Sequence, residues 1–600
     1  MTMFRISACL LLCAVRLAAE VSLQALPEFL RPDPFGGIVA ADRSEPGAKR
    51  ALALSGARAG YVSFHLVVNL PAAGEYNLAL SSHEPGLEID TFREWFHLLD
   101  GAKQYYPDAL VPVRSPYHSR LPEPDNRIAG QTAQAFWIDI WIGNAATPGP
   151  HRIEATLSSG QGQARLPIEV TVLRRSIPAD DAVTVDHNSY GGSWIAEQYP
   201  SRSTGTGDDF FRSPEYFRLI HSYHRIFYEH RGVFHQLGYG HAGKVAPEFA
   251  PALEGSGRKK HIANWDLFDQ HYGPLLDGSA FANTRRGARP IPYVYLPINP
   301  EWPASYLWWG EPGYETEFVN VVSEMERHFR EKGWTHTRFE LFFNHKKRYM
   351  GFPSDGDEVR FPKDNRTLAE FGRLMKKALP ADTPVQIIFR ADVSWDMNQQ
   401  FHDLAGIVKM WICADSILGW YPEAAQALTK RGDIVWFYSG PPSIQKPSAA
   451  ITRFPLQAWV WGINGYVHWL TVSAGPDPWF HSDGGLTALV YPGEKFGFAE
   501  PLPSVRLKIQ RNCLQDLAML NAFTKTSSAL RSAVLQRFNG TKVADWWTPK
   551  PAFADRPPQE WTGSALDEAS KKTEDMFSKI NAPAWDNVHR FVLQLAAEEK

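Results

Sequence analysis

The N-terminal part of the chain contains short runs in which apolar and polar residues alternate. These runs occupy residues 61–68, 75–80, 135–142, 152–157 and 166–173. Turn residues separate them, and none has the spacing of an amphipathic helix. Alternation with a period of two in short segments is typical of strands that bury one face. Residues 20–178 are therefore predicted to form a β-sandwich domain, which ends near Ile177 and Pro178.

After residue 178, continuous apolar runs alternate with helical patterns. The predicted strands begin near Val183, Val233, Pro292, Thr337, Val385, Val408, Ile434 and Tyr466. The clearest predicted helices cover residues 215–230, 315–332, 365–379, 397–404 and 422–430. Apolar runs without alternation are expected of parallel strands that are buried on both faces. Eight strand–helix units in residues 179–525 predict an α/β domain, a (β/α)8 TIM-type barrel.

The two ends of the chain differ from these domains. Residues 1–19 carry Arg5 and Arg16, no acid, and a ten-residue apolar run between the two arginines. This layout predicts a cleaved secretory signal, and the run is too short to span a bilayer. We therefore expect a secreted or periplasmic protein without a membrane segment after cleavage. Residues 526–600 are predicted to be a helical extension, with an amphipathic helix over 564–580.

Composition narrows the function classes. The 62 basic residues nearly balance the 65 acidic ones, which argues against a broadly basic nucleic-acid-binding protein. After signal cleavage only Cys413 and Cys513 remain, and we expect two buried free thiols rather than a disulfide or metal framework. The chain also holds 21 Trp, 21 Tyr and 35 Phe. Aromatic side chains pack cores and also stack on sugar rings, so composition leaves both uses open.

Polar residues at the ends of the predicted barrel strands are the candidates for chemistry, because active sites of such barrels lie at the carboxyl ends of the strands. The candidates are Asp186, His235, Glu340, Asn344, His345, Asp392, Asp415, Tyr438 and Trp469. Carboxylates and aromatic residues at one barrel mouth favour glycoside hydrolysis, with Glu340, Asp392 and Asp415 as the best catalytic candidates. Each carboxylate has an alternative structural role as a helix cap or an ion-pair partner. Glu340 in particular could pair with Arg390 or Arg338 inside the barrel.

Aromatic and basic residues near the same strand ends are candidates for substrate binding. Trp395, Trp420, Trp469 and Trp479 fall at or near these ends. About half of the other tryptophans in this part, Trp308, Trp309, Trp459 and Trp461, are expected to be core. Lys346 and Arg348 belong to the basic run that follows His345. Cations beside a sugar site would favour sulfated or uronic-acid glycans. The alternative is a solvated basic loop.

The C-terminal half resembles a known enzyme family. The motifs that carry the resemblance are 465–469, 477–479, Asp483-Gly484, 491–493, 504–506, Arg511 and Asp516. They are similar to the closing region of glycoside hydrolase family 123, and 134–138 with Pro148-Gly149 resembles the end of that family's N-terminal sandwich. The resemblance spans roughly 130–520. It implies a β-sandwich joined to a (β/α)8 barrel, a retaining exo-β-N-acetylgalactosaminidase activity, an oligo- or polysaccharide substrate, and no metal or organic cofactor.

The mechanism that the resemblance implies needs an adjacent Asp–Glu pair after the fourth strand. The Asp orients the sugar's acetamido group, whose oxygen attacks the anomeric carbon, and the Glu protonates the leaving oxygen. The matching place in this sequence holds Asn344-His345. Three interpretations follow: other carboxylates are recruited, Asn344 and His345 act in a modified mechanism, or the barrel binds glycan without hydrolysing it. The sugar, the linkage and the oligomeric state stay open.

Overall fold

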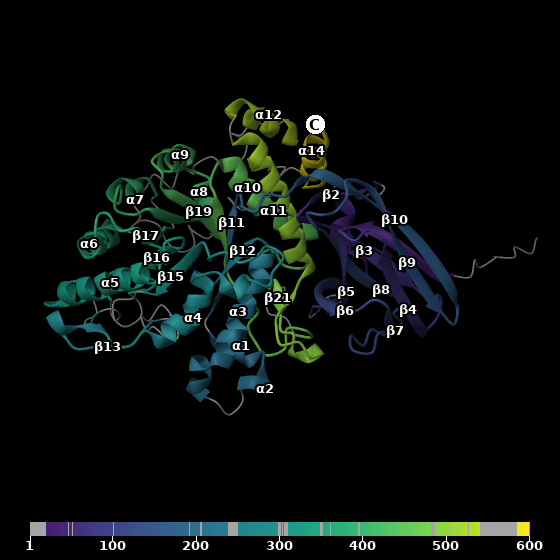
Figure 1. Ribbon diagram of the computed structural model, residues 1–600, viewed down its shortest axis with the longest axis horizontal. Helices are drawn as coiled ribbons and strands as arrows, with labels where there is room; N and C mark the ends of the chain where they lie inside the picture. The colour runs from purple at the N-terminus through teal and green to yellow at the C-terminus, as the bar shows by residue number, and fades with distance from the viewer. Residues whose placement is uncertain are drawn as a thin grey trace, which may run out of the picture.

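The fold is described from a computed structural model (Figure 1). It describes residues 20–45, 47–50, 52–99, 101, 103–190, 192–203, 207–237, 250–297, 302, 304, 310–347, 352–359, 362–393, 397–481, 487–525, 527–539 and 585–598. The predicted signal over 1–19 and the predicted helix over 564–580 lie outside these residues. Within them, no helix is long and apolar enough to cross a membrane.

Two five-stranded sheets form the N-terminal part (right side of Figure 1). The first has the order β1(Ser22–Pro27), β3(Gly60–Asn69), β8(Ala133–Ile142), β5(Leu87–Leu98), β6(Tyr105–Val113). The second has the order β2(Leu54–Arg58), β10(Gly162–Ser176), β9(Gly149–Ser159), β4(Gly74–Ser82), β7(Tyr117–Leu121). Alternate side chains from both sheets, such as Phe64 and Leu66 of β3 and Ala155 and Leu157 of β9, share one hydrophobic cluster. The period-two pattern of the sequence therefore supplies the apolar layer between the sheets.

The next part contains, among the described residues, eight parallel strands in barrel-like order. Around the sheet they are β12(Gly232–Leu237), β11(Thr184–Tyr190), β20(Gly465–His468), β19(Ile434–Ser439), β18(Met410–Ala414), β17(Gln386–Val393), β16(Arg338–Phe342) and β15(Tyr293–Pro297). The two end strands approach each other where the His235 ring donates from Nε2 to the Tyr293 carbonyl, 2.9 Å away. Each predicted strand start lies within two residues of an observed one. This arrangement fits a TIM-like barrel.

Helices cover the barrel strands (left side of Figure 1). They include α3(Pro214–Glu229), α4(Asp266–Leu276), α5(Tyr314–Glu331), α6(Pro362–Ala378), α7(Met397–Asp403), α9(Pro422–Lys430) and α10(Arg453–Trp461). Shorter elements are α1(Gly192–Glu197), α2(Pro200–Ser203), α8(Asp415–Leu418), β13(Leu253–Glu254), β14(His261–Ile262), β21(Val490–Tyr491) and β22(Leu502–Pro503). The five predicted helices are confirmed. The Ser213 hydroxyl caps α3 by accepting from the Tyr216 backbone N–H, and α5 buries Phe318 and Phe329.

The helix α11(Val505–Thr524) joins the barrel to the N-terminal sheets and is buried along almost all of its length. Asp139 of β8 is fully buried and accepts hydrogen bonds from Lys508 Nζ at 2.7 Å and from Arg511 at 2.8 and 2.9 Å. Arg506 pairs in the same way with Asp108 of β6 at 2.7 Å. Because buried charges need partners, these ion pairs fix how the helix sits against the sheet. Arg506 and Arg511, two residues of the family-like motifs, therefore serve the interface.

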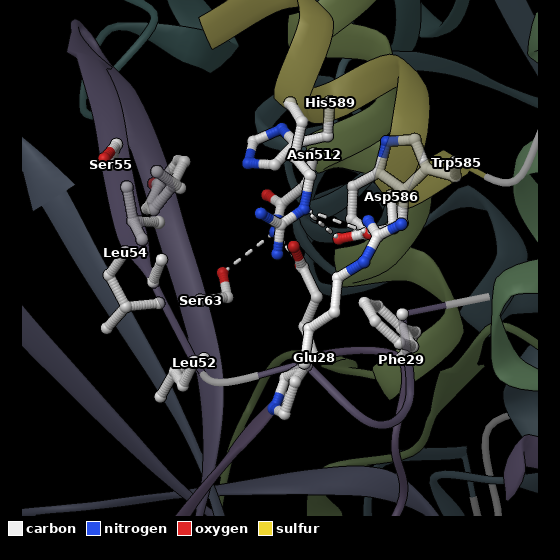
Figure 2. A pocket seen from close by; sticks show the side chains of 17 residues that line it. Glu28, Phe29, Leu52, Leu54, Ser55, Ser63, Asn512, Trp585, Asp586 and His589 are labelled. Atoms are coloured by element: carbon white, nitrogen blue, oxygen red, sulfur yellow. Dashed lines mark hydrogen bonds and ion pairs between the residues drawn. The ribbon is translucent and has the colours of Figure 1, made fainter. Parts of the chain in front are cut away.

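The C-terminal part contains α12(Ser528–Asn539) and α14(Trp585–Glu598). Asp516 of α11 accepts from Trp585 Nε1 at 2.9 Å and from His589 Nδ1 at 3.0 Å. Figure 2 shows Trp585 and His589 beside Asn512 and Glu28, around a cavity of about 50 Å³. Burial raises the pKa of Glu28 to about 7. Burial opposes the positive charge of His589, but Asp516 raises its pKa to about 9. These contacts attach α14 to the rest of the chain.

The two cysteines expected in the mature chain, Cys413 and Cys513, are both buried free thiols. Burial raises the pKa of each thiol well above its ordinary value, so neither forms a thiolate readily. Their sequence-based interpretation as structural residues is confirmed.

Candidate active site

A cavity of about 360 Å³ opens at the carboxyl ends of the barrel strands. Its walls are Asn188, Tyr295, Phe342, Asn344, Lys346, Asp357, Glu358, Arg390, Asp392, Asp415, Tyr438, Ser439, Gly440, Val467 and Trp469. The lining thus combines four carboxylates, two cations, two side-chain amides and four aromatic rings. This position and this mixture are typical of the active sites of TIM-like barrels.

The segment 352–359 brings two acids, Asp357 and Glu358, to the cavity. Its last residue, Val359, pairs in parallel with Val393 of β17, and its N–H donates to the Asp392 carbonyl at 3.1 Å. Earlier in the segment, the Gly356 N–H donates to the carbonyl of His345 at 2.9 Å. A Cβ at Gly356 would lie 2.5 Å from the Phe343 carbonyl oxygen, so only glycine fits this close approach. The segment is therefore held between the ends of β16 and β17.

Asp357 and Glu358 share one cation. Lys346 Nζ lies 2.5 Å from Glu358 Oε2 and 3.3 Å from Asp357 Oδ2. The Tyr438 hydroxyl donates to the other oxygen of Glu358 at 3.1 Å. The backbone of Glu358 has φ 49°, a conformation that non-glycine residues rarely adopt. Such strain persists where the surroundings determine a conformation, and it clusters at functional sites.

Arg390 organises the second group of acids. Its guanidinium binds Asp392 through two hydrogen bonds of 2.7 and 2.9 Å and Glu340 through a third of 2.7 Å. It also lies over the rings of Phe342 and Tyr295, 4.4 and 4.7 Å from their centroids. Burial raises the pKa of Asp392 to about 7 although Arg390 opposes the shift. Burial also raises the pKa of Glu340, which is fully buried.

Asp186 and His235 form a buried pair beneath the cavity. His235 Nδ1 donates to Asp186 Oδ1 at 2.7 Å, while its Nε2 donates to the Tyr293 carbonyl. Because both ring nitrogens donate, the imidazole carries a positive charge. Burial lowers the pKa of His235, but the Asp186 carboxylate more than offsets this, so the pKa lies above its ordinary value. The Tyr295 hydroxyl, which reaches Asp186 Oδ2 at 3.1 Å, connects the pair to the cavity wall.

Asp186, His235 and Glu340 also form a candidate metal-ligand group. Among the described residues, one ligand atom from each lies within 4.8 Å of the others. Both ring nitrogens of His235 and both oxygens of Asp186 already make the hydrogen bonds given above, and Glu340 binds Arg390. A metal ion would have to replace several of these bonds, so the geometry fits an ion-pair network better than a metal centre.

Six of the residues predicted from the sequence line the cavity: Asn344, Lys346, Asp392, Asp415, Tyr438 and Trp469. Three others, Glu340, Asp186 and His235, lie buried beneath it and support its walls. The alternative role of Glu340, a pair with Arg390 inside the barrel, is confirmed. Arg348 and Trp395 lie outside the described residues.

His345, Trp420 and Trp479 are placed differently from the prediction. His345 is buried against Phe352, and burial lowers its pKa to about 4, so it is a neutral side chain behind the wall rather than a cation or a proton donor at neutral pH. Trp420 is buried and is not part of the cavity lining. Trp479 packs edge-on against Trp95 of β5 and donates to the Pro492 carbonyl. An indole that is 3% exposed in a separate hydrophobic cluster has no face for a sugar at this cavity.

Sequence reasoning missed Asp357, Glu358 and Arg390 as members of the site. The first two are an adjacent Asp–Glu pair thirteen residues after Asn344-His345, and this doublet was visible in the sequence. The rule that functional residues directly follow a strand excluded it, because 352–359 begins well beyond β16. Arg390 lies within β17. A charged residue in an otherwise apolar strand is rarely buried without a partner, so its presence in the sequence indicated a special position.

Comparisons with known proteins show a solved structure that shares this fold. No family model matches the sequence, and no curated protein matches it. Among solved structures, the chain shares the fold of a glycoside hydrolase. That protein is a family 123 glycoside hydrolase from Clostridium perfringens, described for glycolipid glycan hydrolysis; the TM-score is 0.62 at 12% identity, over 96% of this chain and 99% of that one.

More distant matches include the xylanase 10B modules of Clostridium thermocellum and the β-glucuronidase of Ruminococcus gnavus. The xylanase has a TM-score of 0.30 at 10% identity, over 82% of this chain and 93% of that one. The glucuronidase has a TM-score of 0.28 at 9% identity, over 76% and 65%. The likeness to the family 123 enzyme concerns the fold.

Proposed function

We propose that the protein is a glycoside hydrolase that cleaves an oligo- or polysaccharide in the cavity at the barrel mouth. The observation that carries the proposal is the convergence of Asp357, Glu358, Asp392 and Asp415 on one cavity whose walls also hold Tyr438 and Trp469. Two carboxyl groups that flank a glycosidic bond are the usual means of cleaving it, and aromatic rings bind the apolar faces of sugars. The fold shared with a family 123 glycoside hydrolase supports the proposal.

Within this proposal, Asp357 and Glu358 are the acid pair and the substrate carries an N-acetylhexosamine. The acetamido oxygen attacks the anomeric carbon, and the bond to the leaving oxygen breaks while Glu358 gives that oxygen a proton. Asp357 accepts a hydrogen bond from the acetamido N–H and stabilises the positive charge that develops on the ring formed. Water then attacks the anomeric carbon, the bond to the acetamido oxygen breaks, and Glu358 takes the proton of the water. An adjacent Asp–Glu pair on one wall suits this division of roles.

The cations of the cavity favour a neutral sugar over an anionic one. Lys346 is bound to Asp357 and Glu358, and Arg390 is bound to Glu340 and Asp392. His345, which directly precedes the basic run in the sequence, is neutral at pH 7 because burial lowers its pKa to about 4. A sulfate or carboxylate on the sugar would therefore meet carboxylates rather than an uncommitted cation on the described walls.

The proposal extends to the organisation and location of the protein. The two N-terminal sheets with their shared core are interpreted as a β-sandwich, joined through α11 to the catalytic barrel. The arginine-flanked apolar run of residues 1–19 supports export, so the substrate is expected in the periplasm or outside the cell. The alternative to hydrolysis is a barrel that binds glycan without cleaving it.

The test is turnover of a substrate panel by the purified protein. The panel contains aryl β-N-acetylhexosaminides and neutral, sulfated and uronic-acid oligosaccharides. Glu358→Gln and Asp357→Asn should each lower kcat about 100- to 10,000-fold, the usual contribution of a catalytic acid or base. Glu254→Gln and Asp382→Asn, at exposed positions outside the cavity lining, are matched controls that should keep full activity. Sugar binding without turnover of any substrate would favour the glycan-binding alternative.

A further inference from the structure

Lys346 occupies an unusual position for a lysine. It follows the end of β16 by four residues, its side chain is 14% exposed, and it lines the cavity. Burial opposes its charge, but Asp357 and Glu358 raise the pKa of Lys346 above the ordinary value, so the ammonium group is present at all physiological pH values. Sequence reasoning treated Lys346 as a substrate-binding cation. Its contacts show instead that the ammonium group pairs with two carboxylates of the protein, those of Asp357 and Glu358.

We propose that Lys346 is a positioning residue whose ammonium group holds Asp357 and Glu358 side by side at the cavity wall. The inference rests on the proposed function, in which these two carboxyl groups are the acid pair. Lys346 Nζ contacts one oxygen of each, at 2.5 Å for Glu358 and 3.3 Å for Asp357. A single cation that bridges two adjacent carboxylates constrains their separation and their direction.

The charge inventory of the cavity explains why a cation is required here. The described lining has four carboxylates, those of Asp357, Glu358, Asp392 and Asp415, against two cations. Arg390 is committed to Asp392 and to Glu340 beneath it. Among the described residues of the lining, Lys346 is therefore the cation that offsets the repulsion between the adjacent acids.

A second contact completes the clamp. The Tyr438 hydroxyl donates to Glu358 Oε1, so both oxygens of this carboxylate are held, one by β19 and one by the segment after β16. The left-handed backbone of Glu358 (φ 49°) would relax if the side chain were released, because this conformation is unfavourable for glutamate. Loss of Lys346 is thus expected to disorganise the pair rather than only to remove a charge.

The same arrangement predicts a change in pH dependence. Lys346 pairs directly with Asp357 and Glu358, and the other titratable or charged groups that line the cavity with it are Arg390 and Asp392 from β17, Asp415 after β18, and Tyr438 from β19. Asp355, in the same segment as Asp357 and Glu358, pairs with Lys347. Carboxyl groups hold their protons to higher pH when a neighbouring cation is removed. The pH–rate profile of a variant without the positive charge should therefore move toward higher pH.

The test compares Lys346→Met and Lys346→Arg with the wild type and with Lys430→Met, an exposed control on α9. With an aryl β-N-acetylhexosaminide, Lys346→Met should lower kcat about 100-fold, as misplacement of catalytic groups by about 1 Å does, while KM changes less than about threefold. Its pH–rate profile should move toward higher pH. Lys346→Arg keeps the charge and should recover at least about tenfold of the lost kcat with a profile near that of the wild type.

Two kinetic results would overturn the inference. One is a Lys346→Met enzyme with kcat within about threefold of the wild type; the other is a Lys346→Arg enzyme as impaired as Lys346→Met, with both profiles unmoved. A crystal structure of Lys346→Met separates this inference from the proposed function, since it needs no activity. The Asp357 and Glu358 carboxylates should leave their places, and unchanged carboxylates would refute the positioning role. Absence of turnover by the wild type on the whole panel would instead count against the proposed function.

Discussion

Arg390 is the cation on which the buried carboxylates of the site depend, and Arg390→Met would remove it while keeping an apolar side chain of similar length. The guanidinium is 3% exposed and makes three hydrogen bonds of 2.7 to 2.9 Å to Glu340 and Asp392. Removing one partner of a buried ion pair costs about 3–5 kcal/mol, because the remaining charge stays buried without compensation. We expect a loss of this size in the free energy of unfolding at pH 8.

The loss should depend on pH, and the sign follows from the two carboxyl groups. Burial already raises the pKa of Asp392 to about 7 and that of Glu340 above its ordinary value. A carboxyl group with a raised pKa binds more protons in the folded than in the unfolded state, so the folded state loses stability as pH rises from the ordinary value through the raised one. Without Arg390 both values rise further, and each carboxyl adds up to about 1.4 kcal/mol of destabilisation per pH unit in that window.

The assay is urea unfolding at pH 5 and pH 8, followed by tryptophan fluorescence. At pH 5 the carboxyl groups of Arg390→Met can stay protonated in the folded state, so the variant should be closer to the wild type than at pH 8. Arg258→Met, at an exposed site, is the matched control and should change stability by less than about 0.5 kcal/mol at either pH. An equal loss at the two pH values, or a loss below about 1 kcal/mol at pH 8, would refute the reasoning.

Three further predictions concern the rest of the molecule. Asp139→Asn leaves two buried cations of α11 facing an uncharged amide and should lower the free energy of unfolding by about 3 kcal/mol, seen as a lower urea midpoint; an unchanged midpoint contradicts this. Trp479→Ala should lower Tm and leave sugar affinity unchanged, whereas Trp469→Ala should weaken sugar binding about tenfold in calorimetry; the reverse pattern would disprove the placement of the two indoles. Burial opposes the charge of His589, but Asp516 raises its pKa to about 9. The stabilisation of the folded state by charged His589 is therefore complete below about pH 6.5 and is lost as pH rises through 9. Limited proteolysis should therefore release α14 faster at pH 9.5 than at pH 7, and His589→Asn should remove this difference.

The barrel could be predicted from the sequence because its pattern is local. Strands buried on both faces appear as apolar runs, and helices such as 315–332 show their buried positions every three or four residues. The same pattern locates the strand ends, and it therefore identified Asn344, Asp392 and Tyr438, which line the cavity. These residues were accessible because one rule, that barrel sites form at the carboxyl ends of strands, connects them to the pattern.

The acid pair could not be placed in the same way. Asp357 and Glu358 reach the cavity because Val359 pairs with Val393, a contact between backbones that no local pattern records. The prediction that Trp479 binds substrate was wrong for a similar reason. Its partner Trp95, whose indole N–H donates to the Trp479 carbonyl, lies 384 residues away in β5 of the N-terminal sheets. Periodicity shows that an aromatic residue is buried or exposed, but it does not show against which distant surface the residue packs.

The most direct test of the central claim is a crystal structure of Glu358→Gln with an N-acetylhexosamine-containing oligosaccharide bound. The account predicts the sugar in the cavity at the barrel mouth, with the glycosidic oxygen within about 3.2 Å of the residue 358 side chain and the acetamido N–H donating to Asp357. An apolar face of the ring should lie against Trp469 or Tyr438. A sugar bound elsewhere, or bound here with the glycosidic oxygen beyond reach of both residues, would contradict the account.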